Sequence, residues 1–429
     1  MAFKPGSISV EYIALHSYKT GNRILLDGMV GSDTEKGVMM SFTESIFLPY
    51  ITGRILVVDN KNLRSQMPLA GEELLEVSFI TNDLIGKATP TKLLFQVTAC
   101  YQDVQGSQKS RNFVLELKTF DFYANLLTRE RSAYTGQVSD IVGNIYNHSI
   151  VPLMQESSIP LTIETTGNST TYVAPNVNPF IAIKHLTGMA VSQAGYGDFM
   201  FYRDTVGLNF VSLGTLIREL KPIMNYRVSY EQLRDSSKSI AGESTMDTAA
   251  MYQVVQSWKV LKAFDRIERA IDGSMGTDTY NVDTVQKKIT KMHYGYSDNF
   301  LQYPHLNSRP LDVDAPKPYS MQVKRVISND VLFDTFKDYS AVVGHQRDVQ
   351  LAAPYFNQQS LEVLGITGIH RCGTKITLSV PSYTQSDSSK AYMPDTDDYY
   401  TANYMVHTID HSISLSQYKV NLSIFKEST

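Results

Sequence analysis

Apolar and polar residues alternate along much of this 429-residue chain. A period of two is typical of strands that bury one face of a sheet. In the first 118 residues it predicts short strands at 8–12, 24–26, 38–46, 54–58, 75–79, 93–97 and 113–117. Glycines, Pro49 and a polar turn at 102–110 separate these strands. The pattern therefore predicts an antiparallel sandwich or barrel whose edges must be covered or paired with another chain.

The end of the chain predicts an antiparallel hairpin within 399–426. A lone hairpin is marginal in water, so the last strand should join a sheet begun far upstream. One face of the predicted hairpin carries Tyr404, Val406 and Thr408 on the first strand and Tyr418, Val420, Leu422 and Ile424 on the second. The opposite, polar face carries His407, Lys419, Asn421 and Ser423.

A helical period replaces the alternation after residue 120. It predicts one helix over 136–153 and a second over 178–195. In the second helix Asn178 has the place of an N-cap, Pro179 the first helical position and Gly195 the position past the end. Strands at 199–202 and 208–211 follow, so we expect a small α+β unit here.

The last 200 residues return to alternation. Strands are predicted at 226–230, 251–261, 280–296, 323–328 and 376–380, with a short helix ending at Gly273 and a helix at 348–363 that Pro354 starts or kinks. The loop 235–250 is expected to be mobile, and the loop 382–398 to be disordered until a partner binds. The predicted fold is mainly β with an α+β insertion, in domains spanning 1–128, 129–222 and 223–429.

Composition narrows the possible functions. The net charge of −4 argues against a groove that neutralises nucleic-acid phosphates. Neither a leader with a charged start and an apolar centre nor an apolar run of about 18 residues occurs, so we expect neither standard secretion nor a membrane span. Cys100 and Cys372 give no disulfide framework or zinc spacing, which fits assembly in a reducing cytoplasm.

Two histidines invite a metal-site interpretation. His407 and His411 are four residues apart, but on a strand this spacing separates them by roughly 13 Å. We therefore expect them to be histidines of a polar face or an interface. Trp258, the single tryptophan, is expected in the core or at a subunit interface.

The candidate carboxylates do not indicate a metal site or a catalytic pair either. Asp395, Asp397 and Asp398 lack the glycine and the bidentate glutamate of an EF-type calcium loop, so a solvated acidic loop is expected. Glu72 and Glu73 are adjacent on a strand and point to opposite faces, so they cannot share a substrate. No nucleophile elbow, phosphate-binding loop or dinucleotide fingerprint occurs. The sequence therefore predicts no catalytic, cofactor-binding or metal-binding residue.

Several segments resemble the central baseplate hub proteins of contractile-tailed bacteriophages. In the first third these are ISVEY from Ile8, FTESIFLPY from Phe42, GRILVVD from Gly53 and LAGEEL from Leu69. Farther on they are FDRIE from Phe264, GTKITLSVP from Gly373, YMVHTIDH from Tyr404 and YKVNLSIFK from Tyr418. The likeness extends over nearly the whole chain, but its motifs are strand patterns without diagnostic chemistry.

The resemblance implies two tail-tube-like antiparallel β-barrels per chain and a homotrimer, related in architecture to the hub part of type VI secretion spike proteins. Such a ring would adapt a six-fold tail tube to a three-fold central spike and form part of the DNA channel. It implies a non-enzymatic virion protein without cofactors, assembled in the host cytoplasm. The implied partners are the tail tube, central spike, other baseplate and tape measure proteins, with DNA passing unbound. A tail-tip cell-wall hydrolase and a glycan-binding tail protein are the alternatives.

Overall fold

The computed structural model describes most of the chain. The described residues are 6–17, 21–26, 38–60, 62–63, 67, 69–81, 88–107, 110–154, 159–229, 251–271, 276–283, 287–296, 299–311, 326–327, 342–382, 396–414 and 417–429. The predicted loop 235–250, and most of the loop 382–398, lie outside them.

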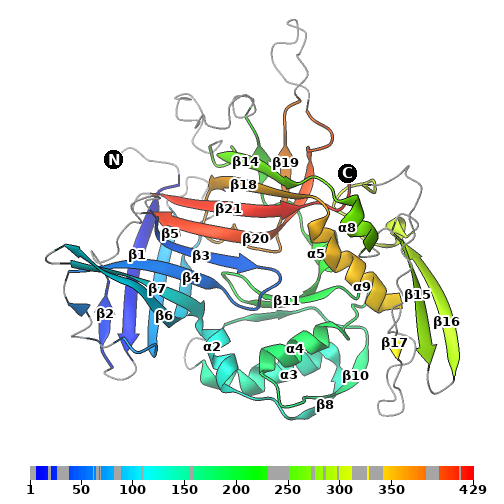
Figure 1. Cartoon of the computed structure of the whole chain (residues 1–429), viewed down its shortest axis with the longest axis horizontal. Helices are drawn as coiled ribbons and strands as arrows, with labels where there is room; N and C mark the ends of the chain where they lie inside the picture. The colour runs from blue at the N-terminus through cyan, green and yellow to red at the C-terminus, as the bar shows by residue number, and fades with distance from the viewer. Residues whose placement is uncertain are drawn as a thin grey trace, which may run out of the picture.

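A broad, mainly antiparallel sheet runs through the molecule (Figure 1). Its first half comprises β1 (Ile8–Ser17), β2 (Arg23–Leu25), β3 (Val38–Ser45), β4 (Thr52–Asp59), β5 (Glu73–Thr81), β6 (Thr91–Ser107) and β7 (Ser110–Thr119). Its second half comprises β13 (Asn225–Arg227), β14 (Ser257–Lys262), β18 (Gln358–Leu364), β19 (Lys375–Ser379), β20 (Ala402–Ser414) and β21 (Tyr418–Phe425). All the strand regions predicted for the first half are confirmed.

The two halves form one sheet because β3 pairs with β20. The strand order is β14-β18-β21-β20-β3-β4-β7-β6-β5-β1-β2. The register places His411 beside Phe42 and Asp410 beside Thr43. The neighbouring strands β3 and β20 come from opposite ends of the chain. The two halves are therefore parts of one sheet and not two separate layers.

The second half curls back toward its own edge. β13 pairs in parallel with β19, and an isolated bridge joins Arg227 to Val254, shortly before β14 begins. In the first half, the described pairings end at β2. The fold is thus confirmed as mainly antiparallel β, while the two closed barrels stay a prediction.

An α+β unit lies below the sheet in Figure 1. It contains α2 (Phe120–Leu127), β8 (Ala133–Gln137), α3 (Val138–Ser149), a 3₁₀ turn (Val151–Leu153), β9 (Leu161–Ile163), β10 (Ser169–Val173), α4 (Pro179–Thr187), β11 (Phe199–Arg203), β12 (Leu208–Ser212) and α5 (Leu213–Glu219). Its apolar core is separate from that of the large sheet. β11 pairs with β3 through Arg203 and Ser45, which attaches the unit to the middle of the sheet.

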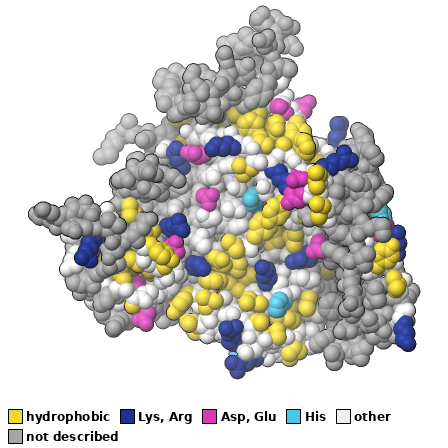
Figure 2. All heavy atoms as spheres, viewed as in Figure 1, with side chains coloured by type: hydrophobic (Ala, Val, Ile, Leu, Met, Phe, Trp, Pro, Cys, Tyr) yellow, Lys and Arg dark blue, Asp and Glu magenta, His cyan; other side chains and the backbone are white. Residues whose placement is uncertain are grey.

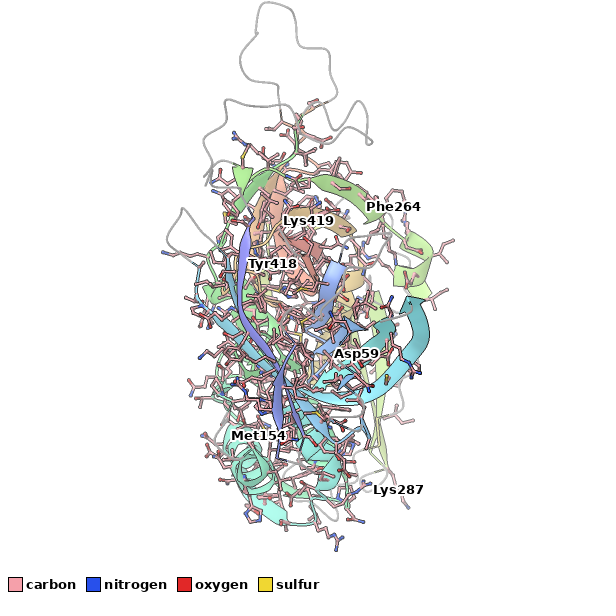
Figure 3. The ribbon with its side chains drawn as sticks, turned by 90° about the vertical axis from the view of Figure 1, so that its left-hand side faces the viewer. Asp59, Met154, Phe264, Lys287, Tyr418 and Lys419 are labelled. Carbon is pink, nitrogen blue, oxygen red and sulfur yellow. The ribbon has the colours of Figure 1, made fainter. Side chains whose placement is uncertain are left out.

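A second, smaller sheet stands beside the first. It comprises β15 (Gly276–Asp283), β16 (Lys288–Gly295) and β17 (Val326–Ile327), with α8 (Arg266–Ile271) and α9 (Val342–Ala352) nearby. Short 3₁₀ turns lie at Phe300–Gln302 and Ala353–Tyr355. Figure 3 labels Lys287, at the tip of the β15–β16 hairpin, well below Phe264, which follows β14.

The predicted helix at 348–363 is wrong. α9 ends at Ala352, Pro354 lies in the 3₁₀ turn, and Gln358–Leu364 is strand β18. Proline removes a backbone donor and clashes with the preceding turn, which ends the helix. Beyond it, Gln359, Leu361 and Val363 alternate with half-buried neighbours, which is the period of a strand.

The helix predicted at 178–195 is shorter than expected. It starts at Pro179 as predicted but ends at Thr187, and Gly195 lies in a later turn with φ +91°. Asn178 occupies the N-cap position without capping its own helix, since its side-chain oxygen accepts from Arg129 at 3.0 Å and its amide N–H donates to the carbonyl of Asn125. The Asn125 side chain instead accepts from the backbone N–H of Phe180 at 2.7 Å.

The C-terminal hairpin is confirmed, with one correction. Tyr404, Val406 and the predicted row of β21 are buried, but the register shifts between Val406 and Thr408. An extra residue at such a bulge reverses which side chains face inward. His411 is therefore inside the core, whereas Thr408 is only half-buried.

Candidate functional site

A polar face extends across both halves of the joined sheet. Cross-strand partners share a face, so Asp410, Thr43, Thr52 and their neighbours form one continuous surface. We define the polar face by the residues that line its two hollows, of about 490 and 380 Å³. They include Lys259, Ser360, Glu362, Lys419, Asn421, Asp410 and Ser412 in the second half and Ser41, Thr43, Arg54, Glu116 and Lys118 in the first.

Charges on the polar face are largely paired. Lys419 Nζ lies 2.7 Å from Glu362 Oε1, and Arg54 lies 3.0 Å from Glu116. The hydroxyl of Thr43 donates to Asp410 Oδ1 at 2.6 Å, which links the two halves. Figure 2 shows the area over β21, β20 and β3 as mainly uncharged, with scattered charges of both signs. Such a surface offers polar contacts without the clustered cations that hold phosphates.

A chain of buried polar groups lies beneath this face, where β3 meets β20. Tyr418 Oη is 2.6 Å from His411 Nδ1, and His411 Nε2 is 3.2 Å from Glu44 Oε1. The imidazole also stacks on Phe42, with ring centroids 4.1 Å apart. Burial lowers the pKa of His411 to about 3, so the ring is neutral and can donate from Nε2 while accepting at Nδ1.

The Glu44 carboxylate joins three parts of the structure. Its Oε1 accepts from the backbone N–H of Cys372, just before β19, at 3.1 Å. Its Oε2 accepts from the backbone N–H of Thr205, in the turn after β11, at 2.9 Å. Burial, reinforced by Asp204, raises the pKa of Glu44 well above its usual value. We call Glu44, His411 and Tyr418 the seam triad, because they fix the α+β unit and both halves of the sheet at one point.

A second buried carboxylate lies where β11 meets α5. Asp198 Oδ2 accepts from the backbone N–H of Gly214 at 2.8 Å. Burial is the main cause that raises the pKa of Asp198 to about 7. The charged form is therefore disfavoured near neutral pH.

This shift predicts a stability that depends on pH. Between its ordinary value of 3.8 and about 7, the folded protein holds a proton on Asp198 that the unfolded chain does not. The resulting stabilisation is fully present below pH 3.8 and is lost progressively as the pH rises from there through about 7. A shift of three units corresponds to about 4 kcal/mol at most. Asp198→Asn should melt above the unmodified protein at pH 8 but close to it at pH 4, and parallel melting-temperature profiles would contradict the assignment.

The residues considered from sequence do not form a site. His407 is the unpaired residue at the bulge, and His411, farther along β20, belongs to the seam triad. Glu73 is buried rather than at the surface, and it accepts from the N–H groups of Ala70 and Gly71 in the preceding turn. Asp397 accepts from the N–H groups of Tyr399 and Tyr400, also a turn role. Trp258 is half-buried at the margin of the main core, as expected.

An exposed apolar patch lies beside β14, the last strand in the order of the described sheet. Phe264, Ile267 and Ile271 repeat at helical spacing but are 77%, 74% and 67% exposed, and Leu261 is 59% exposed. We call these four residues the α8 patch, and Figure 3 labels Phe264 on this projecting region. The spacing of these residues predicted the short helix, but it did not predict that the apolar face of this helix is exposed to solvent. A cluster of large exposed apolar side chains marks an interaction surface.

Within the described ranges, no three His, Cys, Asp or Glu side chains are grouped to hold a metal ion. The described helices include none with the length and apolarity needed to cross a membrane. Cys100 and Cys372 are both free thiols.

Comparison with known proteins identifies the fold as that of phage tail proteins. The tail protein from Neisseria meningitidis MC58 matches with a TM-score of 0.53 and 10% identity, over 97% of this chain and 96% of that chain. The 43 kDa tail protein of prophage MuSo2 from Shewanella oneidensis matches with a TM-score of 0.56 and 9% identity, over 97% and 98%. No family model and no curated protein sequence matches the chain. The resemblance noted from sequence is thus confirmed at the level of the fold.

Proposed function

We propose that this chain is a structural hub of a contractile phage baseplate, without enzymatic activity. The observation that carries the proposal is the joining of two strand-rich halves through β3 and β20. In the proposed assembly each half is one tube-like barrel, within domains 1–128 and 223–429, and residues 129–222 form the unit outside them. Whole-length similarity to two phage tail proteins supports a structural role in a tail.

A homotrimer would turn these paired halves into a ring. Three chains would present six similar units to a six-fold tail tube and three equivalent faces to a three-fold spike. Among the described strands the order ends at β14 on one side and at β2 on the other, so the two ends of the joined halves differ. Unlike ends suit head-to-tail contacts, which form a ring when the rotation from one chain to the next closes the circle. The α8 patch lies at the β14 edge, where the next chain would cover it.

The polar face is our candidate for the wall of the central channel. It crosses both halves, and its four basic side chains (Lys259, Lys419, Arg54, Lys118) nearly balance its three acidic ones (Glu362, Asp410, Glu116). The face carries a net charge of only +1, and its cations lie among carboxylates instead of clustering, so little DNA would be retained by counterion release. DNA could therefore pass through the lumen without specific binding.

The remaining partners follow from this position. The ring would contact the tail tube protein on one side and the central spike protein on the other, with further baseplate proteins and the tape measure protein as neighbours. The protein would assemble in the host cytoplasm and remain in the virion. No cofactor enters the proposal.

The assembly state tests the proposal. We expect native mass spectrometry to give three times the chain mass of 48.2 kDa, and negative-stain images to show a ring. Ile267→Glu should dissociate the trimer, because it would place a charge in the buried contact.

Ile289→Glu is the matched control. Ile289 is also 67% exposed, but it lies on β16, away from the α8 patch. The control should leave the trimer intact. A monomeric unmodified chain would contradict the ring, whereas a trimer unaffected by Ile267→Glu would contradict only the place given to the α8 patch.

A further inference from the structure

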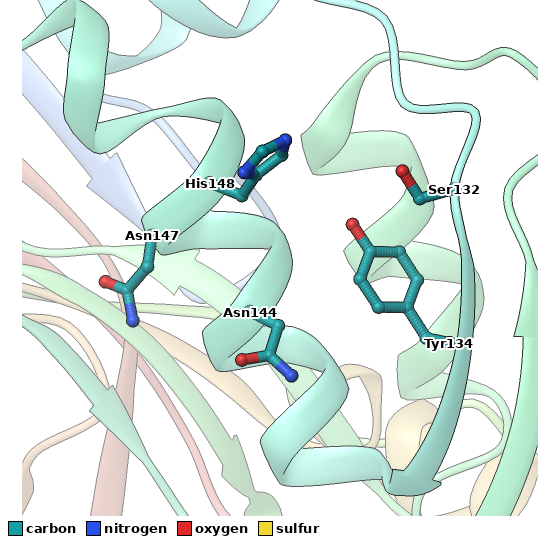
Figure 4. Close-up of a pocket in the computed structure, with 5 residues that line it drawn as sticks. All are labelled: Ser132, Tyr134, Asn144, Asn147 and His148. Carbon is teal, nitrogen blue, oxygen red and sulfur yellow. The ribbon is translucent and has the colours of Figure 1, made fainter.

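A shallow hollow of about 490 Å³ lies between α3 and β8 in the α+β unit. Asn144, Asn147 and His148 come from α3, where spacings of three and four residues place them on one face. Tyr134 and Ser132 face them from β8 and the residues before it (Figure 4). Figure 4 shows the Tyr134 hydroxyl directed toward the side that carries His148. The seam triad and the polar face are not part of this hollow.

A buried carboxylate fixes one wall of the hollow. Glu130 accepts from the Ser149 hydroxyl at 2.6 Å and from the backbone N–H of Ser132 at 3.0 Å. Although burial opposes it, hydrogen bonding by the Ser149, Ser132 and Tyr134 side chains lowers the pKa of Glu130. Glu130 thus holds the backbone at Ser132 in place, and the hydroxyls of Ser132 and Tyr134, which can each donate and accept, line the hollow. The Tyr134 ring also packs against the core of the unit, which holds its orientation.

The opposite wall supplies donors. The amides of Asn144 and Asn147 offer N–H groups and carbonyl oxygens, and all three α3 side chains are exposed. No lysine or arginine lines the hollow, so a phosphate would lack a fixed cationic partner. No aliphatic side chain lines it either, so an apolar ligand would gain little by burial.

We propose that this hollow binds a neutral carbohydrate. A sugar hydroxyl both donates and accepts, and it can pair with the acceptors of Ser132 and Tyr134 and with the amide of Asn144. The less polar face of a sugar ring can lie against the half-buried Tyr134 ring. This function goes beyond a hub role and does not depend on it.

Saturation-transfer NMR on the full chain tests the site with two neutral trisaccharides as probes, triacetylchitotriose and maltotriose. We expect saturable binding of at least one of them. Asn144→Ala should weaken it about tenfold, the effect of losing one hydrogen bond of ordinary strength. Alanine favours helices, and residue 144 is exposed on α3, so this variant should fold normally. Tyr134→Phe, which keeps the ring and removes the hydroxyl, should weaken binding as well.

Tyr101→Phe is the matched control, because Tyr101 is a 53% exposed tyrosine on β6 outside the hollow. It should leave the binding unchanged. Absence of saturable binding by both trisaccharides would overturn the proposal. Equal affinity in Asn144→Ala would do so too, as would displacement of the saccharide by triglycine at similar concentration, which would indicate a peptide site.

Discussion

Val420→Asp is expected to cost several kcal/mol of stability, which is much of a domain's usual margin of roughly 5–15 kcal/mol. Val420 is fully buried on β21, between Val363 of β18 and His411 of β20. An aspartate there must lose its hydration or take up a proton. Thermal melts should show the loss directly, and sedimentation should show whether assembly is lost with it.

The adjacent residue provides the control. Lys419 points to the polar face, where its ammonium pairs with Glu362 and remains about two-fifths exposed. Lys419→Gln removes this surface pair, which is worth about 1 kcal/mol or less. Lys419→Asp is a harsher test of the same face, since it adds a second carboxylate beside Glu362. Similar small losses for Val420→Asp and Lys419→Gln would show that β21 is not half-buried.

The strands of this fold were predictable because alternation is a local signal. Each row of β21 can be read from residues two positions apart, and all four members of the predicted row are buried. The bulge near His407 was not predictable in the same way. One unpaired residue reverses the face on which every later side chain of the strand lies. Alternation alone does not reveal this residue, so it predicted His411 on the polar face.

The seam triad could not be predicted from the sequence, for a different reason. Glu44 and His411 are separated by 367 positions, and no local pattern signals that β3 will pair with β20. Taken separately, each looks like an ordinary polar residue within a strand. The wrong prediction of a helix at 348–363 has a local cause. The apolar residues of β18 also fit a helical period if the break at Pro354 is ignored.

The seam triad makes Glu44→Ala the most informative substitution at this junction. Removing the carboxylate leaves the N–H groups of Cys372 and Thr205, and Nε2 of His411, without their acceptor in a buried region. An unsatisfied buried donor costs about 1–3 kcal/mol, less where water enters the space left by the side chain. With three donors affected, we therefore expect a total loss of about 3–5 kcal/mol.

The matched control for Glu44→Ala is Glu116→Ala. Glu116 also pairs across strands, but its partner Arg54 is largely exposed, so the loss should be about 1 kcal/mol or less. Glu44→Gln should fall between the two, because it keeps the side-chain volume and one acceptor oxygen but turns an amide toward a backbone N–H. Melting temperatures in the order Glu116→Ala, Glu44→Gln, Glu44→Ala, from highest to lowest, would support the seam triad as the point that fixes the two halves together. A Glu44→Ala protein as stable as Glu116→Ala would show that the halves are held by strand pairing and apolar packing alone.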